Sequence, residues 1–265
     1  MDFIQIGNLR VSRVILGSNP FGGFSHQGPG RDDEMLHYYS AARIKEVLRQ
    51  AERLGINTIM ARADQHMIRL LMEYRDEGGC LQWIAQTCPE LGTIEQGIHK
   101  ALPWGARGCY IHGGVMDFLY ANNKLEAVPA ALAKIRRAGI PAGIAAHNPK
   151  VLAWAEDNLD VDFYMCSYYN PIPREENPAH VSGSEERYNS GDRDIMAAAI
   201  RGLKKPAIHY KVMAAGRDDP EEALAFTARN MRPGDGVCIG IFAKDNLSML
   251  EEDVALLYRY LRAQK

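Results

Sequence analysis

Short apolar runs rich in β-branched residues alternate along the chain with longer segments whose apolar residues recur at i, i+3, i+4 and i+7. Runs of the first kind are typical of buried strands, and the longer periodic segments are typical of amphipathic helices. The predicted strands are Val14–Ser18, Asn57–Arg62, Gln82–Thr87, Gly108–His112, Pro141–His147, Val161–Ser167, Pro206–Met213 and Gly236–Phe242. The predicted helices are Ala41–Leu54, Met67–Glu77, Thr93–Leu102, Leu125–Ala138, Lys150–Asn158, Asp192–Lys204, Pro220–Met231 and Ser248–Ala263.

The strict alternation of strand and helix predicts a parallel sheet, and eight such units are the number that closes into a (β/α)8 TIM barrel. A doubly wound open sheet is the competing fold. It is disfavoured because the stretch after the first strand, residues 17–23 (GSNPFGG), is not a GxGxxG phosphate loop. No linker, repeat or low-complexity tract divides the chain, so we expect residues 1–265 to form a single barrel domain.

Two connections are longer than a barrel requires. One covers residues 19–40 after the first strand, and the other covers residues 168–193 after the sixth. Loops of this length are more often lids or binding loops than plain connections, and both leave the carboxyl ends of strands, where barrel enzymes carry their active sites. At the last predicted helix, Ser248 and Glu251 have the spacing of a capping box.

Polar side chains concentrate at the carboxyl ends of the predicted strands, whereas the strand starts are mostly apolar or neutral. In this fold, functional side chains occupy the last residues of a strand or the positions just beyond. The candidates are Asn19, Arg62, Asp64, His66, Gln86, His112, His147, Tyr169, Asn170, Lys211 and Lys244. His209 also lies near a strand end. We therefore expect a polar site at one mouth of the barrel.

A metal site is one use for part of this set. Asp64 and His66 are two residues apart, and His112 and His147 follow neighbouring strands, so the four could surround one ion. Imidazole and carboxylate suit Zn, Mn or Fe, which would act as a Lewis acid on a carbonyl or a diol. The alternative is that these groups bind a polar ligand directly, since no HExxH-type spacing supports the metal.

Lys211 is the most versatile single candidate. It could form a Schiff base, act as a general base, or anchor an anionic substrate, and the anchoring role is the commonest. Together with Arg62 and Arg217 it favours a ligand that carries a carboxylate, a phosphate or several oxygens. Arg217 could also be purely structural.

Composition limits the partners. The formal net charge is −2, without the basic surplus of a nucleic-acid-binding protein. No apolar run reaches the roughly 20 residues of a membrane span, and residues 1–17 lack the features of a signal peptide. The five cysteines include no CxxC pair, which is typical of reduced thiols. These features predict a soluble cytoplasmic protein with a small-molecule substrate, and they leave the oligomeric state open.

Several motifs resemble those of the aldo-keto reductases. Residues 7–17 (GNLRVSRVILG) are similar to the segment that leads into the first barrel strand of that family. Gly55–Thr58 resembles its second-strand motif, Tyr110–His112 its fourth-strand motif with the active-site histidine, and Tyr169–Pro171 its sixth-strand Tyr-Asn-Pro. Residues 206–216 match its seventh strand. The resemblance covers nearly the whole chain and implies the same type of barrel.

The resemblance also implies a hydride transfer from NADPH, in which an Asp, Tyr, Lys and His tetrad protonates the carbonyl oxygen. Only the histidine is retained, as His112. The positions of the aspartate, the tyrosine and the lysine correspond to Met60, Gln65 and Thr87. Because the Lys–Asp pair is what lowers the pKa of the acid tyrosine, the usual proton donor is lost.

The cofactor positions are mixed. Tyr210 corresponds to the aromatic residue on which the nicotinamide ring stacks. The residues that hold the carboxamide correspond to Ala146, His147 and Cys166, and the hydroxyl residue at the pyrophosphate corresponds to Lys211, which could still bind phosphate. The segment 240–253 keeps the outline of the adenosine-phosphate region with Lys244 as its one cation. These differences weaken the case for NADP binding and do not exclude it.

Three functions remain open at this point. The favoured one is an enzyme that performs lyase, isomerase or epimerase chemistry, with or without a metal, on a small polyhydroxylated carbonyl compound such as a sugar or sugar acid. His112, His147 and His66 would be acid–base groups or ligands, and Lys211 and Arg62 would bind or polarise oxygen. The second is a divergent NAD(P)H-dependent oxidoreductase with His112 as proton donor, assisted by His66 or Gln65. The third, a non-catalytic ligand-binding barrel, is disfavoured because it would not need so many ionisable groups at one mouth.

Overall fold

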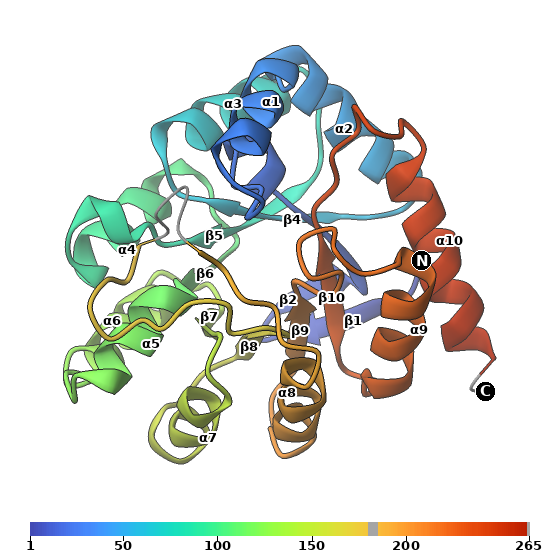
Figure 1. The fold of residues 1–265 in the computed structure, drawn as a ribbon. Coiled ribbons are helices and arrows are strands. Elements are labelled where there is room, and N and C mark those ends of the chain that lie inside the picture. The colour runs from blue at the N-terminus through green and yellow to red at the C-terminus, as the bar shows by residue number, and fades with distance from the viewer. Residues whose placement is uncertain (180–184, 264–265) are drawn as a thin grey trace.

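Eight parallel strands form a closed barrel in the computed structural model, which describes residues 1–179 and 185–263 (Figure 1). The strands follow one another around the barrel in chain order, and the last pairs with the first. They are β3 (Val14–Gly17), β4 (Thr58–Arg62), β5 (Gln82–Gln86), β6 (Gly108–Ile111), β7 (Ala142–Ala146), β8 (Phe163–Ser167), β9 (Ala207–Tyr210) and β10 (Gly236–Ile239). The predicted (β/α)8 barrel is confirmed, although β9 and β10 end three residues earlier than the apolar runs suggested, and β3, β5, β6 and β7 end one residue earlier.

Helices surround the barrel. They are α1 (Pro29–Tyr38), α2 (Ala41–Arg53), α3 (Gln65–Asp76), α4 (Ile94–Ala101), α5 (Gly113–Ala121), α6 (Val128–Arg137), α7 (Pro149–Asn158), α8 (Asp192–Arg201), α9 (Pro220–Asn230) and α10 (Met249–Arg262). Short 3-10 turns cover Asn19–Gly22, Pro89–Leu91 and Leu102–Trp104. The sequence analysis missed α1 and α5. Helix α5 is apolar at nearly every position, so it lacks the polar face that reveals a surface helix.

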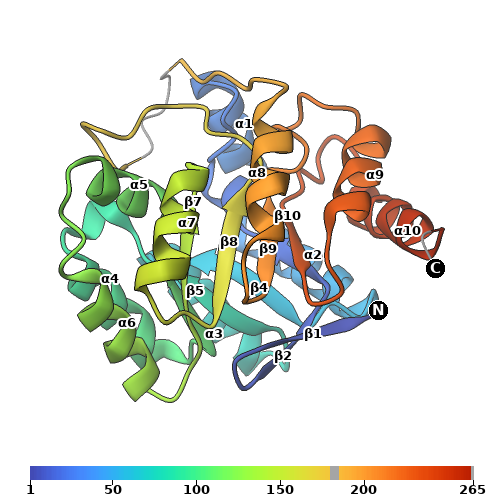
Figure 2. The same ribbon diagram turned by 90° about the horizontal axis from the view of Figure 1, so that it is seen from below.

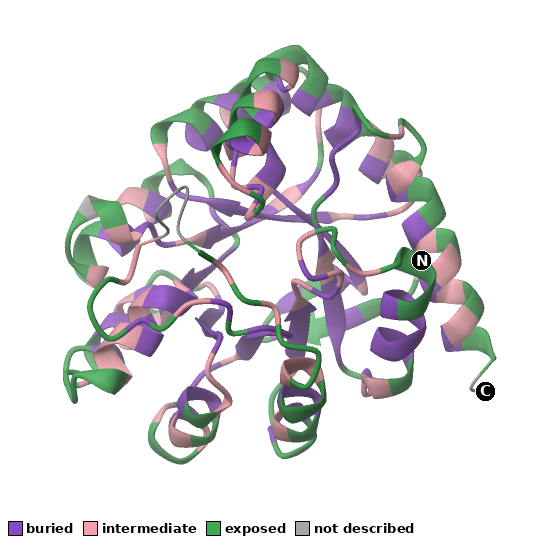
Figure 3. Ribbon diagram, in the orientation of Figure 1, coloured by how far each residue is buried: buried purple, intermediate pink, exposed green. Residues whose placement is uncertain are grey.

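The apolar side chains meet where sheet and helices face each other (Figure 3). The barrel strands are buried on both faces, whereas the helices bury one face and expose the other. This is the pattern expected for a parallel sheet that is covered on both faces, because one face packs in the barrel interior and the other packs against the helices, away from water. The rigid barrel holds the carboxyl ends of its strands as a fixed frame for side chains.

An antiparallel hairpin of β1 (Phe3–Ile6) and β2 (Leu9–Ser12) precedes the barrel, and the sequence analysis did not identify it. Its apolar side chains belong to the same buried cluster as the lower barrel interior: Ile4, Ile6, Leu9 and Val11 join Ile15, Ile84, Phe163 and Ile208. Figure 2 places the hairpin at the opposite end of the barrel from α1 and the loop after β8. The hairpin therefore packs into the end of the barrel that lies away from the loops.

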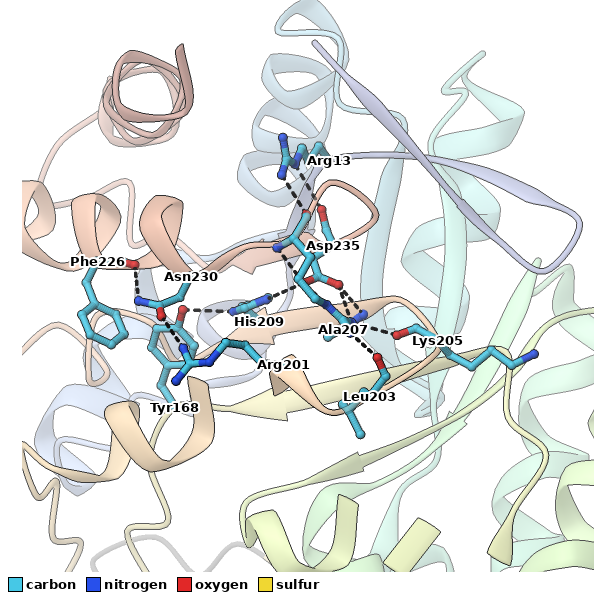
Figure 4. Close-up of polar contacts among 11 residues, drawn as sticks. Arg13, Tyr168, Arg201, Leu203, Lys205, Ala207, His209, Phe226, Asn230 and Asp235 are labelled. Atoms are coloured by element: carbon cyan, nitrogen blue, oxygen red, sulfur yellow. Dashed lines mark hydrogen bonds and ion pairs between the residues drawn. The ribbon is translucent and has the colours of Figure 1, made fainter. Parts of the chain in front are cut away.

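His209 lies in a buried polar network between the barrel and its outer layer (Figure 4). Its Nδ1 lies 3.0 Å from the Tyr168 hydroxyl and its Nε2 lies 3.4 Å from a carboxylate oxygen of Asp235. Asp235 also accepts hydrogen bonds from Ala207 N and from the Arg232 guanidinium. Although burial opposes it, the bonds from His209 and Arg232 hold the pKa of Asp235 well below its usual range. This network joins β9 to the turn before β10.

Helix α10 begins at Met249, one residue after the predicted start, with Ser248 at its N-cap position, and the predicted capping box is wrong. Ser248 has φ −93° and ψ 3°, outside the extended conformation that aims a capping hydroxyl at the first turn, and its side chain makes no capping bond. Asn246 serves this end of the helix instead, by accepting from Ser248 N and donating to Glu252. A reciprocal capping box is present at Thr93 and Gln96.

In the described part of the chain, every helix is too short or too polar to cross a membrane.

Candidate functional site

A cavity of about 370 Å³ lies at the carboxyl end of the barrel. Its floor is formed by side chains of the barrel interior, Met60, Tyr110, Ala145 and Met165. The loops after β3 and β9 supply much of its wall. Four of the sequence candidates line it: Asn19, Gln86, Tyr210 and Lys211.

Tyr210 is linked to a buried histidine and carboxylate. Its hydroxyl lies 3.3 Å from Nε2 of His147, whose Nδ1 lies 2.7 Å from a carboxylate oxygen of Asp117. The same carboxylate accepts the backbone N–H of His147, and of Asn148 after it. Gly113, at the start of α5, makes room for the arrangement, since a Cβ there would lie 3.1 Å from the Tyr210 hydroxyl.

These contacts indicate which atoms carry the protons along the line of hydrogen bonds from Tyr210 through His147 to Asp117. An ionised Asp117 accepts the Nδ1 proton of His147, which leaves Nε2 to accept the Tyr210 hydroxyl proton. Burial lowers the pKa of His147, although Asp117 opposes this, so the ring is neutral at rest. Burial, together with the charge of Asp117, raises the pKa of Tyr210 well above its usual range. A proton taken up by Tyr210 can thus pass to His147, where Asp117 stabilises the imidazolium.

Lys211, the next residue, faces a different set of partners. Its φ of 55° lies in the left-handed region, which is strained for a residue with a side chain. Its Nζ lies 3.1 Å from Nε2 of His26, whose Nδ1 lies 2.7 Å from a carboxylate oxygen of Glu186. His26 comes from the loop after β3 and Glu186 from the loop after β8, so both long loops meet at this lysine.

The amine of Lys211 is held in an unusual protonation state. Burial lowers the pKa of Lys211 to about 7; Glu186 opposes this shift, and the positive charges of Arg174 and Arg217 reinforce it. Arg217 also donates to the backbone oxygen of His26 and stacks on the ring of Tyr188. Near neutral pH, Lys211 is therefore present both as an amine and as an ammonium, which suits a group that gives and takes protons.

His112, the histidine retained from the reductase motif, caps helix α5. Its Nδ1 accepts the backbone N–H of Gly114 at 3.1 Å, and its own N–H donates to the Thr87 hydroxyl at 3.0 Å. Burial lowers the pKa of His112 well below its usual range, and the charges of His147 and Arg62 add to this effect. His112 is not among the residues that line the cavity.

The four residues expected as metal ligands do not converge. Asp64 caps helix α3 by accepting Met67 N and pairs with Arg62, while His66 is exposed on the same helix. His112 and His147 make the contacts given above. Among residues 1–179 and 185–263, no group of three or more His, Cys, Asp or Glu side chains is placed to hold a metal ion. The reason is that Asp64 and His66 lie at the start of a helix and not on the barrel strand.

The remaining candidates lie around the cavity and not in its wall. Arg62 is buried, stacks on Phe24 and pairs with Asp64 and Glu90. Tyr169 is buried, and its hydroxyl donates to Asp218 at 2.5 Å, while Asn170 is exposed. Lys244 pairs with Glu34. The expected loop 168–193 includes residues 180–184, which lie outside the described residues.

No protein-family model and no curated protein matches this chain. Several solved structures, however, match this chain in fold. A protein assigned as an aldo-keto reductase from Pseudomonas aeruginosa is 17% identical, with a TM-score of 0.64 over 98% of this chain and 96% of that one. An aldo-keto reductase from Bacillus halodurans in its holo form is 10% identical, with a TM-score of 0.60 over 99% and 96%. The chain has an aldo-keto reductase-like barrel. The N-acetylmannosamine-6-phosphate 2-epimerase from Clostridium perfringens is 14% identical, with a TM-score of 0.53 over 92% and 93%.

In this reductase-like barrel, the positions that correspond to the tetrad are no longer assembled. Met60 forms part of the apolar cavity floor. Gln65 is exposed at the first turn of α3, and Thr87 accepts the bond from His112 N described above. The ionisable groups of the cavity lining include instead Tyr210, the last residue of β9, and Lys211, which follows it.

The residues also do not fit the dinucleotide that the reductase resemblance implies. Of the two lysines expected at phosphate positions, Lys244 pairs with Glu34 and does not line the cavity, whereas Lys211 lines the cavity and contacts His26. Arg31 does line it, but its guanidinium pairs with Glu34 and Asp245. The same wall carries the carboxylates of Asp218, Asp245 and Asp253, which would repel a phosphate.

Sequence reasoning missed Asp117, His26 and Glu186. A signal for Asp117 was present, because it is the one charged residue in the apolar segment Gly113–Ala121. The loops that carry His26 and Glu186 were identified as functional segments, but nothing in their composition indicates that these two side chains meet beside Lys211.

Proposed function

We propose that this protein is an enzyme that moves a proton at the carbon next to the carbonyl of a small polyhydroxylated compound, such as a sugar or a sugar acid. The reaction is of the isomerase or epimerase type and uses no bound nicotinamide. The observation that supports it most is the pair of proton-transfer groups in one cavity: Tyr210, backed by His147 and Asp117, and Lys211, backed by His26.

The first step uses the Tyr210 relay. The Tyr210 oxygen accepts the proton from the substrate carbon while the phenol proton passes to Nε2 of His147. The electron pair of the C–H bond moves toward the carbonyl and gives an enediolate. The positive charges of Lys211 and Arg174, which act on this site, stabilise the developing oxyanion.

The second step uses Lys211. In an epimerisation its ammonium returns a proton to the opposite face of the same carbon. In an isomerisation the ammonium protonates the carbonyl oxygen to give the enediol. The neighbouring hydroxyl then returns its proton to the Lys211 amine, while the His147 imidazolium, through Tyr210, delivers the abstracted proton to the former carbonyl carbon. The two side chains contact different partners, His147 for Tyr210 and His26 for Lys211. This difference favours approach to the substrate from two sides. Solvent exchange at His147 and Lys211 restores the starting protonation states.

Deuterium exchange tests the proposal without knowledge of the product. The purified protein is incubated in D2O with a panel of aldoses, ketoses and sugar acids, and proton NMR follows the hydrogen next to each carbonyl. We expect exchange with at least one compound, unaffected by a chelator, and its loss in Asp117→Asn. Consumption of NADPH with an aldehyde or keto-sugar, in the absence of any exchange, would overturn the proposal in favour of a reductase.

A further inference from the structure

The part of the cavity wall formed by α10 holds a buried carboxylate whose charge is not compensated. Asp253 is 4% exposed and lines the cavity. Among the described residues it has no hydrogen-bond or ion-pair partner, in contrast to Asp218, which accepts from Tyr169, and Asp245, which pairs with Arg31. A buried carboxylate without a partner is costly, so its retention in a cavity wall indicates a partner that arrives with the ligand.

Arg31 carries a second unsatisfied group in the same cavity wall. Its terminal nitrogens pair with Glu34 and Asp245, and its plane stacks on Phe242. Its Nε is buried without a hydrogen-bond partner among the described residues. Because this nitrogen is closed off from the cavity, a ligand cannot reach it, and the Asp253 carboxylate is the group left to accept a bond from a ligand.

The charges around Asp253 determine which kind of hydrogen-bond donor is favoured beside it. Asp218, Asp245 and Asp253 line this cavity, and Arg31 is paired by Asp245. A cation is therefore favoured over an anion beside Asp253. Burial raises the pKa of Asp253 to about 7, as expected for a carboxyl group that lacks a compensating charge.

We propose that Asp253 forms a subsite for a ligand that carries a primary ammonium group, as an amino sugar does. The ammonium donates to the Asp253 carboxylate. This inference deepens the proposed function and rests on it for the sugar-like frame of the substrate. The subsite itself requires only binding.

Calorimetric titration with D-glucosamine and D-glucose tests the subsite, because the two sugars differ in one ammonium group. A charge-assisted hydrogen bond predicts that the wild-type protein binds D-glucosamine at least about tenfold more tightly. Asp253→Asn should remove this preference. Glu252→Gln, a change at the exposed neighbour on the same helix, should keep it. Circular dichroism establishes that each variant is folded.

Equal or undetectable binding of both sugars by the wild-type protein would overturn the subsite, and so would a preference that survives in Asp253→Asn. The titration does not depend on turnover. Deuterium exchange without an ammonium preference would reject the subsite alone, and an Asp253-dependent preference without exchange would reject the proposed reaction alone.

Discussion

The hydroxyl of Tyr210 lies 3.3 Å from Nε2 of His147. Because Asp117 holds the other ring nitrogen, the contact aligns a phenol, an imidazole and a carboxylate in one chain. Such a chain allows a neutral imidazole to take up a proton at little cost, since the charge forms beside a fixed carboxylate. The barrel therefore carries acid–base groups even though the aspartate, tyrosine and lysine positions of the reductase tetrad correspond to Met60, Gln65 and Thr87.

Asp117→Asn should reduce turnover about 100-fold or more, because the imidazolium of His147 loses its compensating charge. Steady-state kinetics with the substrate found by deuterium exchange measures the effect. Asp162→Asn is the matched control, since that carboxylate also accepts a buried backbone N–H, from Ala142, at the start of β7. Equal losses in the two variants would contradict a role for Asp117 in proton transfer.

Lys211→Met should remove one limb of the pH–rate profile. The pKa of Lys211 is lowered to about 7 by burial, so the free amine becomes the main species above that pH. In the reaction direction in which Lys211 removes the proton, kcat/KM of the wild-type enzyme should rise with pH through about 7. A profile of Lys211→Met with the same rise would assign the limb to another group.

His112→Ala should destabilise the protein by about 1 kcal/mol through loss of the cap of α5, and His112→Asn should restore the loss, because asparagine is a good capping residue. Since His112 does not line the cavity, turnover per folded molecule should change less than tenfold in His112→Asn. Urea unfolding and single-substrate kinetics measure the two effects. A loss of turnover as large as that in Asp117→Asn would make His112 a catalytic residue.

Asp235→Asn should cost about 3–5 kcal/mol of unfolding free energy at pH 7, because it leaves Arg232 and His209 without their buried partner. The pKa of Asp235 is depressed in the folded state, so its contribution is present above the ordinary pKa of about 4 and is lost as the pH falls below it. Urea unfolding at pH 7 and pH 3 tests both statements. An unchanged difference at pH 3 would contradict the assignment.

Asp253→Asn should stabilise the ligand-free protein at pH 8 by about 1–3 kcal/mol, because it replaces an uncompensated buried charge with a neutral amide. The folded-state pKa of Asp253 is raised to about 7, so the penalty is present above pH 7 and fades as the pH falls toward 4, where both states are protonated. Urea unfolding at pH 8 and pH 4 measures it. Glu252→Gln should leave stability nearly unchanged at both values, and an equal gain there would point to a general charge effect.

The barrel could be predicted from the sequence because its strands are short apolar runs between amphipathic helices, and this periodicity survives without any alignment. Helix α5 could not, since Gly113–Ala121 has almost no polar face to set its period. The β1–β2 hairpin was missed because its strands, Phe3–Ile6 and Leu9–Ser12, contain exposed positions between buried ones and so lack the continuous apolar run of the barrel strands.

The site was predicted in part for a similar reason. Lys211 could be found because strand ends are fixed by the barrel, and Tyr210 was found only through the reductase resemblance; both line the cavity. His26 and Glu186 could not, because they belong to loops whose course depends on tertiary contacts and not on a repeating pattern. Asp64 and His66 follow a strand but start a helix, which turns them away from the other expected ligands.

The position of the β1–β2 hairpin, which packs into the end of the barrel away from the loops, affects how the chemistry of this barrel could change. Ile4, Ile6, Leu9 and Val11 supply packing at the end of the barrel far from the loops, and they share one buried cluster with Met60 of the cavity floor. The aspartate of the reductase tetrad, whose position corresponds to Met60, could thus be replaced by an apolar side chain that joins the barrel interior, without weakening the scaffold. The packed end of the barrel and the end that carries the ionisable side chains are separate, so the chemistry at the loop end could change while the packing at the other end stayed the same.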